Sequence, residues 1–389
     1  MSGASIYDLL HEYEAPVVEE EEAAPQNLTY QADRLYLISG IALTAAGSVA
    51  MGKMPEQAVS ELSQDLKDTR GQRLPVYGVK QAMSVESLAT LGAEGKAQRL
   101  HELVQTLMHD VMLLLSDLPK GNGCDIVLSA PLHSTEAQRL ILEHMRSAMI
   151  KGGFEACLGD IRHVASGWDP HAVLDTGEEG GQPYVLWLSV DSLLNRADVA
   201  ALHQRGILRL PEQPAGVCPG EAAVALLIRR MPEEEDADLE GWQLDRAQVM
   251  ERQPRPKGRN SKATGSSDLD KLLELIWPED KVPEGPSWVV VDALRTADSS
   301  QEVSNSLSER WPGLHIVTGG ISVANWCGWP GEALTALQLI LAMADLPAED
   351  SALVLNVCED KLARALVLQT CAQTPEPEQE AAGTADKEN

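Results

Sequence analysis

Four side chains in this sequence are of a type that can act as a nucleophile and lie at or near predicted turns: Cys157, Ser166, Cys218 and Cys327. A thiol or hydroxyl attacks an acyl donor only when an adjacent base or a positive environment activates it, and the oxyanion that forms then needs hydrogen-bond donors. The chemistry that these residue types allow is nucleophilic attack. The question for each of them is whether the chain also supplies a base.

Cys157 and Ser166 lie close together along the chain, in FEACLGDIRHVASG and the overlapping turn VASGWDPHAVL. The residues after Cys157, LGDIRHVAS, have the pattern of a continuing strand, which favours a structural thiol. A corner falls instead at Ser166-Gly167, and the helix after it is expected to be short because it contains Pro170. Both positions remain open for an elbow between a strand and a helix, and we favour Ser166-Gly167.

Cys218 belongs to the stretch GVCPGEAAVALLIRR, in which a turn leads into an apolar strand. Pro219 and Gly220 predict a tight turn, and the small residues that follow allow the strand to lie close to a neighbouring element. Glu221 is expected to accept hydrogen bonds from nearby backbone. Cys218 is therefore interpreted as a packed turn residue without a chemical role.

Cys327 lies between Trp326 and Trp329 in the stretch NWCGWPGEA. A thiol framed by two indoles in a turn could be reactive, whereas buried packing is the more ordinary interpretation. We favour packing.

The histidines do not form an evident metal site. His163 and His171 are eight residues apart near a corner and could face one another, and His101 and His109 are two turns apart on one predicted helix. The first pair is interpreted as solvated rather than metal-binding, and the second is too far apart for one chelate without a third ligand. Motifs for a dinucleotide, a phosphate loop, HExxH and GxSxG are also missing from the sequence. We therefore predict no metal and no cofactor.

The chain is strongly acidic, with 31 basic and 59 acidic residues and a net charge of −28. This balance argues against nucleic acid and against an anionic membrane as partners. Solubility alone explains it, and a basic protein partner is the alternative. The six cysteines have no paired spacing, which indicates reduced thiols and a cytoplasmic protein. We find neither a signal peptide nor an apolar run long enough to span a bilayer.

Apolar strand-like runs alternate with helical segments along most of the chain. The runs CDIVLSAPL, PYVLWLSVDSLL and SALVLNVCE are nearly continuously apolar, which is typical of strands covered on both faces. Residues 97–118 have helical spacing, and residues 134–153 add a Ser-Thr-Glu cap signal and two closing glycines. The pattern predicts an α/β fold, and the second half of the chain repeats the first in outline.

We divide the chain into five parts. Residues 1–30 are predicted to be a disordered acidic arm, and residues 372–389 a disordered acidic tail. The first half of the fold is expected over 31–231 and the second over 285–371. Residues 232–284 are interpreted as a charged excursion and linker, acidic and then basic, that forms a flexible loop at least as far as residue 268.

Three stretches carry a resemblance to a known family. LISGIALTAAG, the segment from Val185 to Ile228 with its VDS and PGEAA, and CGWPGEALTALQLILAMA together resemble the thiolase-like superfamily, within it β-ketoacyl synthase-like proteins. The resemblance covers about residues 35 to 370 and leaves the middle segment unmatched. It implies a thiolase-like fold, with two similar α/β/α halves whose mixed sheets pack around central helices.

The same resemblance implies where catalytic residues belong. An active ketosynthase has a nucleophilic Cys on an elbow before a helix of small residues, and two imidazoles, or His and Asn, from its second half. This chain has Leu294 and Arg295 where a Gly-rich turn carries His, and Trp329 at the later His position. His315 is expected to cap or flank a strand. We predict that no catalytic residue is present and that three residues are vestigial candidates: Cys157, Ser166 and Cys327.

The function implied by the resemblance is that of an inactive relative. Degenerate ketosynthase-like proteins occur as partner subunits, as in chain-length-factor pairs, and thiolase-like proteins accompany type VI secretion effectors. We expect an adaptor or chaperone-like accessory protein that binds a basic client or a related thiolase-like subunit, with a homodimer as a further option. The alternative is an active β-ketoacyl synthase or acyltransferase that uses Cys157 or Cys327. A third option is a sensor that keeps an acyl pocket without turnover.

Overall fold

The computed structural model describes residues 30–80, 82–84, 95–116, 118–119, 121–175, 181–232, 241–252, 267–278, 285–292, 297–314, 320–344, 350–357 and 362–371. The predicted arm before Tyr30 and the predicted tail after Cys371 lie outside the described residues, as do Leu294, Arg295 and His315. The elements are β1 (Tyr30–Thr44), β2 (Gly47–Ala50), β3 (Glu61–Lys67), β4 (Arg73–Val76), α2 (Gly95–Ser116), β5 (Cys124–Ser129), α3 (Thr135–Lys151), η2 (Glu155–Cys157), β6 (Leu158–Val164), α4 (Pro170–Leu174), β7 (Tyr184–Ser192), α5 (Arg196–Gln204), β8 (Glu221–Pro232), β9 (Trp242–Asp245), β10 (Gln248–Glu251), α6 (Asp268–Ile276), β11 (Trp288–Val291), α7 (Ala297–Arg310), β12 (Gly320–Ser322), α9 (Ala324–Cys327), η4 (Gly331–Ala333), α10 (Leu334–Ala344), β13 (Ser351–Asn356) and β14 (Leu362–Thr370).

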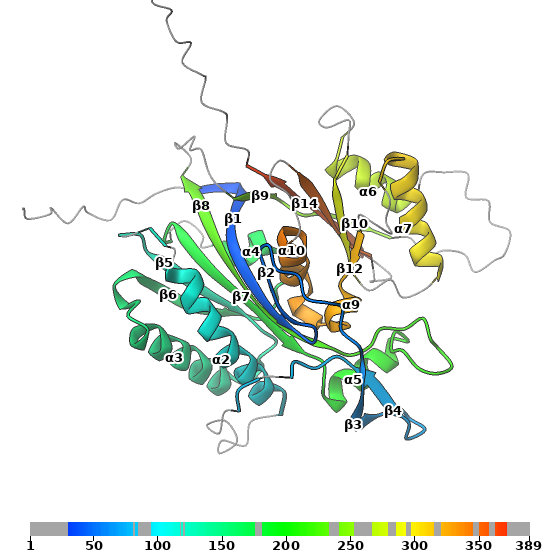
Figure 1. Ribbon diagram of the computed structural model, residues 1–389, viewed down its shortest axis with the longest axis horizontal. Coiled ribbons are helices and arrows are strands. Elements are labelled where there is room, and N and C mark those ends of the chain that lie inside the picture. Colours follow the sequence, from blue (N-terminus) through cyan, green and yellow to red (C-terminus); the bar gives the residue numbers. More distant parts are fainter. Residues whose placement is uncertain are drawn as a thin grey trace, which may run out of the picture.

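One large mixed sheet contains the same strand order twice (Figure 1). The order is β6-β5-β7-β8-β1 in the first half and β12-β11-β13-β14-β9 in the second. In each half three parallel strands are followed by one antiparallel strand, β8 or β14, and then by the strand that opens that half. The predicted similarity of the two halves is therefore confirmed at the level of topology.

The strand that opens the second half lies inside the predicted excursion, and the loop interpretation is wrong for residues 242–251. β9 pairs with β1, where Leu37 lies opposite Trp242, and with β14, where Trp242 lies opposite Thr370. β10 continues along β14 after a one-residue shift in register, and β1 has the same shift along β8 between Leu37 and Ser39. The two short strands are polar as well as apolar, so it is hydrogen bonding to distant strands that makes them extended.

Three large apolar clusters fill the space between the layers of the molecule (Figure 1). Helices α2 and α3 cover the outer face of the first half's sheet, and α6 and α7 cover the outer face of the second. Between the two halves of this sheet lies α10, all of whose residues are buried. Its counterpart α4, which also joins the third and fourth strands of its half, has only five residues. The central layer is therefore built mainly by the second half.

The helix ends follow the signals in the sequence. Ser134 caps α3 by accepting a hydrogen bond from the Ala137 N–H, as the cap signal predicts. Asp169 caps α4 in front of Pro170, the residue that limits where this helix can begin. None of the helices in the described part of the chain combines the length and apolarity that a bilayer crossing needs.

Candidate functional site

The favoured elbow lies where the sequence predicts it, between the end of β6 and the start of α4. Ser166 is exposed at this corner, and its hydroxyl donates a hydrogen bond to Glu332 Oε2 at 2.9 Å. The Gly167 N–H points to the same carboxylate oxygen at 3.4 Å. Glu332 belongs to η4, directly before α10, so this contact joins the elbow of the first half to the central helix of the second.

The elbow offers a hydroxyl and a carboxylate; of the two neighbouring histidines, one is hydrogen-bonded to a backbone carbonyl and the other is buried. His163 Nε2 lies 2.8 Å from the Ala130 carbonyl, so this ring is held against β5. His171 is buried in α4. A Ser hydroxyl is a weak nucleophile until an adjacent base activates it, and imidazole is the side chain best suited to that role near neutral pH. The described contacts of Ser166 supply no imidazole.

Cys157 is not at the elbow. It ends the short helix η2, immediately before β6, and so lies at the opposite end of that strand from Ser166. Its thiol is half-buried and donates to the Phe154 carbonyl at 3.2 Å. The strand after Cys157 and the short helix after Ser166 both agree with the sequence prediction.

Cys218 and Cys327 are both buried. Cys327 ends α9 with none of its surface exposed, its thiol facing the Val323 and Gly328 carbonyls at 3.8 and 3.7 Å. Burial raises the pKa of the Cys327 thiol far above its ordinary range. Burial also raises the pKa of Cys218, against the opposing effect of the neighbouring Arg209. Because the thiolate is the reactive form, both environments oppose nucleophilic chemistry.

The PGE turn is a backbone junction between the two halves. The Gly220 N–H donates to the Trp329 carbonyl at 3.1 Å, the Trp329 N–H donates to the Cys218 carbonyl at 2.9 Å, and the Tyr77 N–H donates to the Pro219 carbonyl at 3.0 Å. A Cβ on Gly220 would lie 1.7 Å from the Cys327 carbonyl oxygen, so only glycine allows these two segments of the backbone to come this close. The sequence predicts a close approach for the strand after this turn, through Ala222 and Ala223, and the structure shows a further close approach at Gly220 itself.

Glu221 is fully buried directly after this turn. It accepts the Val79 N–H at 2.8 Å, which is the backbone bond that the sequence predicts. The Ser192 hydroxyl donates to it at 2.7 Å, and Arg99 of α2 pairs with it. The role of Arg99 was not foreseen, because nothing in the local sequence links it to a carboxylate 122 positions away.

Asp191, at the end of β7, is the second buried carboxylate of this region. Its Oδ1 lies 2.9 Å from Lys96 Nζ, and its Oδ2 accepts the Glu332 N–H at 2.9 Å. Burial raises the pKa of Asp191, although Lys96 and the backbone donors oppose the shift. For Lys96, burial is outweighed by Asp191 and Asp198, which together raise its pKa. The VDS and PGE residues thus hold α2, two strands and the start of α10 together.

A histidine pair lies away from this region, between α2 and α3. His101 Nε2 is 2.9 Å from His144 Nδ1, and the two rings are stacked with centroids 4.9 Å apart. His101 is fully buried, whereas His109 is exposed, so the two histidines considered together in the sequence face different surroundings. Burial, with a smaller contribution from His144, lowers the pKa of His101 to about 4. Among the described residues, no three His, Cys, Asp or Glu side chains are grouped as metal ligands would be.

A cavity of about 270 Å³ adjoins the junction. Tyr77, Arg209, Cys218, Asn325 and Gly328 are among its lining residues. This cavity gives the region space for a small bound molecule.

Comparison by sequence finds no matching protein-family model and no matching curated protein. Comparison with solved structures finds ketosynthases. The ketosynthase from module 6 of the bacillaene synthase from Bacillus subtilis 168 is similar with a TM-score of 0.50 and 13% identity, over 87% of this chain and 72% of its own. The ishigamide ketosynthase/chain length factor is similar with a TM-score of 0.54 and 13% identity, over 86% of this chain and 99% of its own.

Identities this low establish the fold and not the activity. The repeated strand order, the buried central helix and these structural neighbours agree with one another. The chain has the thiolase-like fold of the ketosynthases, with two similar α/β/α halves whose mixed sheets pack around central helices.

Proposed function

We propose that this protein is a thiolase-fold protein without condensing activity, which acts as an adaptor or accessory partner of another protein. One observation carries the proposal. The elbow presents Ser166, hydrogen-bonded to the Glu332 carboxylate at 2.9 Å, where the fold's condensing chemistry needs an activated thiol. A hydroxyl held by a partly buried carboxylate lacks the acidity of a thiol, and no imidazole is among the described contacts of Ser166.

Two further features support the absence of condensation. Trp329 occupies the position at which the resemblance places a histidine, and it is buried with 4% of its surface exposed. An indole N–H donates but cannot accept a proton, so it cannot replace a catalytic imidazole. The helix after the elbow begins at Pro170 and has only five residues. A nucleophile at the elbow would therefore be followed by a very short helix.

The kind of partner follows from charge and from the free edge of the sheet. A net charge of −28 favours a basic client, for which a secretion effector of the type VI class is the candidate that the resemblance suggests. A related thiolase-like subunit is the second candidate, because one structural neighbour is described as a ketosynthase/chain length factor. Within the described residues β6 pairs only with β5, which leaves an edge for pairing with such a subunit or with a second copy.

The test is the isolation of the full-length chain, tagged, from the cells that produce it. We expect a protein to be retained in stoichiometric amount and to form the complex again from purified components. The variant Arg162→Pro, in the middle of β6, distinguishes edge pairing from other contacts, provided that its free energy of unfolding is unchanged. Recovery of the chain alone, together with turnover of an acyl thioester, would overturn the proposal.

A second candidate function is the binding of an acyl or CoA-type ligand without turnover. The cavity of about 270 Å³ beside Cys218 and Arg209 favours it, because an Arg guanidinium at the rim suits an anionic group. Native mass spectrometry of the freshly purified protein tests this function. A bound acyl or CoA species supports it, and an unliganded mass that does not change with added acyl-CoA contradicts it.

A further inference from the structure

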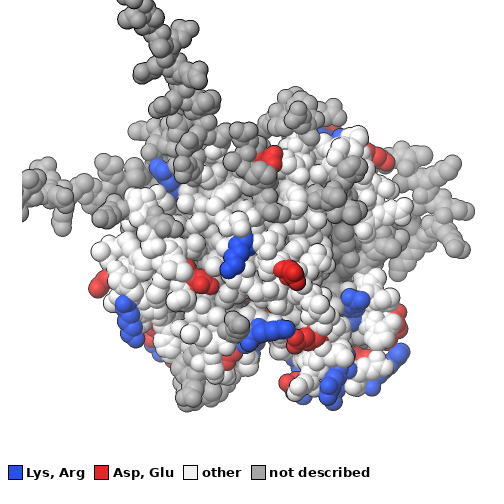
Figure 2. Space-filling model, in the orientation of Figure 1, with Lys and Arg blue, Asp and Glu red and all other residues white. Residues whose placement is uncertain are grey.

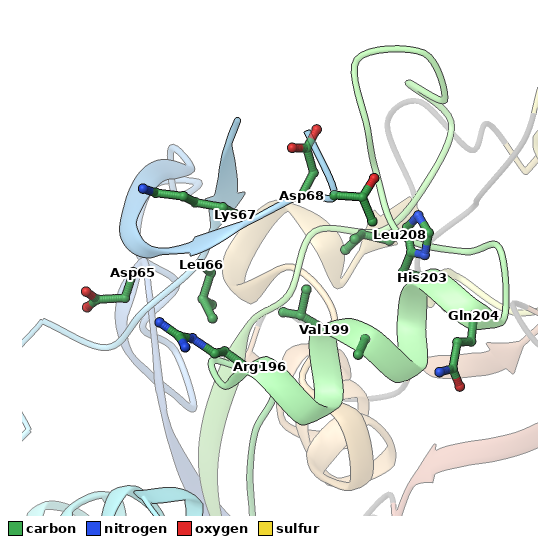
Figure 3. A pocket seen from close by; sticks show the side chains of 11 residues that line it. Asp65, Leu66, Lys67, Asp68, Arg196, Val199, His203, Gln204 and Leu208 are labelled. Carbon is green, nitrogen blue, oxygen red and sulfur yellow. The ribbon is translucent and has the colours of Figure 1, made fainter. Parts of the chain in front are cut away.

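The cavity at the junction differs in charge from a larger cavity that lies between the β3–β4 hairpin and α5. The larger cavity has a volume of about 390 Å³, and its lining includes two carboxylates and two cations: Asp65, Asp68, Lys67 and Arg196 (Figure 3). Figure 2 shows a similar mixture of basic and acidic side chains over this end of the molecule. Because the opposite charges are equal in number, the charge of the larger cavity selects no ligand.

The junction cavity has a single charge in its lining. Among the described residues that line it, Arg209 is the one with a charged side chain, and neither Asp nor Glu is present. Arg209 is exposed, and no described carboxylate forms an ion pair with it. Glu212, three residues further along, pairs with Arg70 instead, at 3.4 Å. In a chain with 59 acidic and 31 basic residues, a cavity lined by a cation alone favours an anionic ligand.

Both halves of the fold build the walls of this cavity, and backbone hydrogen bonds hold them. The Arg209 N–H donates to the Val217 carbonyl at 2.9 Å, and the Val217 N–H donates to the Ile207 carbonyl at 2.7 Å, so the segment that carries Arg209 is closed on itself. Gly328 of the second half lies against Tyr77 of the first, since a Cβ on Gly328 would be 2.8 Å from Tyr77 Cδ2. The cavity is therefore formed before a ligand arrives, which lowers the cost of ordering its walls on binding.

The remaining polar side chains in the described lining carry no charge. Burial raises the pKa of the Tyr77 hydroxyl and the pKa of the Cys218 thiol, and the nearby Arg209 opposes both shifts. Both groups are therefore protonated near pH 7 and can donate a hydrogen bond without adding negative charge. Asn325 is exposed, and its amide adds two N–H donors. A ligand in this cavity thus meets one positive charge and several neutral donors.

Volume and charge together define the class of ligand. The volume of about 270 Å³ lies below the range of about 300 to 1,000 Å³ that is typical of sites for drug-sized molecules. One guanidinium matches one negative charge, and its planar fork fits the two oxygens of a carboxylate. Coenzyme A, with its several phosphate groups, is too large and too highly charged for a cavity of this kind.

We propose that the junction cavity binds a small organic carboxylate, which pairs with Arg209 and accepts hydrogen bonds from Tyr77 and Asn325. Since the walls come from both halves of the fold, the bound carboxylate also links the two halves. This inference rests on the second candidate function, ligand binding without turnover, and names its class of ligand. It is independent of the proposed adaptor function.

Isothermal titration calorimetry of the full-length chain with sodium butyrate tests the proposal. Butyramide is the matched control ligand, because it has nearly the same shape and no charge. We expect butyrate to bind with a Kd of about 1 mM, an ordinary affinity for so small a ligand. Butyramide should bind at least about tenfold more weakly, because it gives Arg209 no negative partner. Equal affinities of the two ligands would overturn the proposal.

A pair of variants tests the role of Arg209. In Arg209→Gln the affinity for butyrate should fall by about tenfold or more, because the charge-assisted pair is lost. The matched control, Arg205→Gln, removes an exposed cation that lines neither cavity, and it should leave the affinity unchanged. Equal butyrate affinities of the two variants would overturn the proposal.

Titration with butyryl-CoA and with inorganic phosphate separates this inference from the function on which it rests. Binding of butyryl-CoA without binding of butyrate would overturn the small-carboxylate inference and leave the second candidate function standing. Binding of phosphate in preference to butyrate would overturn the inference as well. If neither butyrate nor butyryl-CoA binds, both the inference and the second candidate function are refuted.

Discussion

Ser166 and Glu332 meet across the two halves of the fold, with the hydroxyl of the elbow 2.9 Å from the carboxylate that precedes the central helix. The backbone N–H of Glu332 is in turn held by Asp191 at 2.9 Å. The corner at which the resemblance places a nucleophile is therefore tied, through Glu332 and Asp191, to a buried ion pair. The residues around Ser166 therefore hold the two halves of the fold together.

Removal of Lys96 should strongly destabilise the protein. Lys96→Met leaves the Asp191 carboxylate, 3% exposed, without its cation. Loss of one partner of a buried pair costs about 3 kcal/mol or more in the free energy of unfolding. Urea unfolding measures the loss. The control is Lys80→Met, because the pair of Lys80 with Glu61 is exposed, and it should change stability by less than about 0.5 kcal/mol. Equal effects of the two substitutions would contradict the structural role of Asp191.

The junction at Gly220 should not tolerate a side chain. In Gly220→Ala the new methyl group would lie 1.7 Å from the Cys327 carbonyl oxygen, so the backbone of one half must move. We expect a loss of about 3 kcal/mol in the free energy of unfolding, at the upper end for an overpacked site. Gly95→Ala is the matched control, since a Cβ there meets nothing within 4 Å. A neutral Gly220→Ala would show that the two halves do not approach as described.

Much of this junction could be predicted from the sequence. The turn at Pro219-Gly220, the structural role of Glu221, the elbow at Ser166 and the short helix at Pro170 all have local signals, because turn residues, caps and apolar runs act on their own neighbours. The apolar runs of β5, β7, β13 and β14 were equally clear.

The residues that the sequence did not reveal are those whose partners are distant. Lys96 and Arg99 are ordinary helix residues until Asp191 and Glu221 are brought to them, and β9 and β10 are extended only because β14 lies beside them. The pairing of His101 with His144 depends on how α2 lies against α3. No local pattern encodes such contacts.

Acid should destabilise the protein through His101. Burial lowers the pKa of its folded form to about 4, from an ordinary value near 6.5. Between these two values the unfolded chain takes up a proton at this position and the folded chain does not, so stability is lost as the pH falls from 6.5 toward 4. We expect a loss of about 2–3 kcal/mol from this residue by pH 4.5.

Urea unfolding at pH 7 and pH 4.5 measures this loss in the wild type and in His101→Gln. The variant should lack this part of the pH dependence, while His133→Gln, at an exposed histidine, should keep it. If His101→Gln and the wild type lose stability equally between the two pH values, the burial of a neutral His101 is refuted.

The thiols should differ strongly in their reactivity with iodoacetamide at pH 8. Burial raises the pKa of Cys124 to about 12 and that of Cys327 further, so few thiolates form at either position. Cys157 is half-buried and should be alkylated first among these three, with Cys327 slower by about a hundredfold or more. Peptide mass spectrometry of the native protein gives the order. Rapid alkylation of Cys327 would favour the alternative of an active acyltransferase.

The most direct measurement is the intact mass of the full-length protein after incubation with an acyl-CoA and with an acyl-pantetheine thioester. We predict an unchanged mass, because Ser166 is held by Glu332, with no imidazole among its described contacts, and the Cys327 thiol is buried in its protonated form. An acyl adduct that disappears in Cys157→Ser, Cys327→Ser or Ser166→Ala alone would contradict this prediction and identify a working nucleophile.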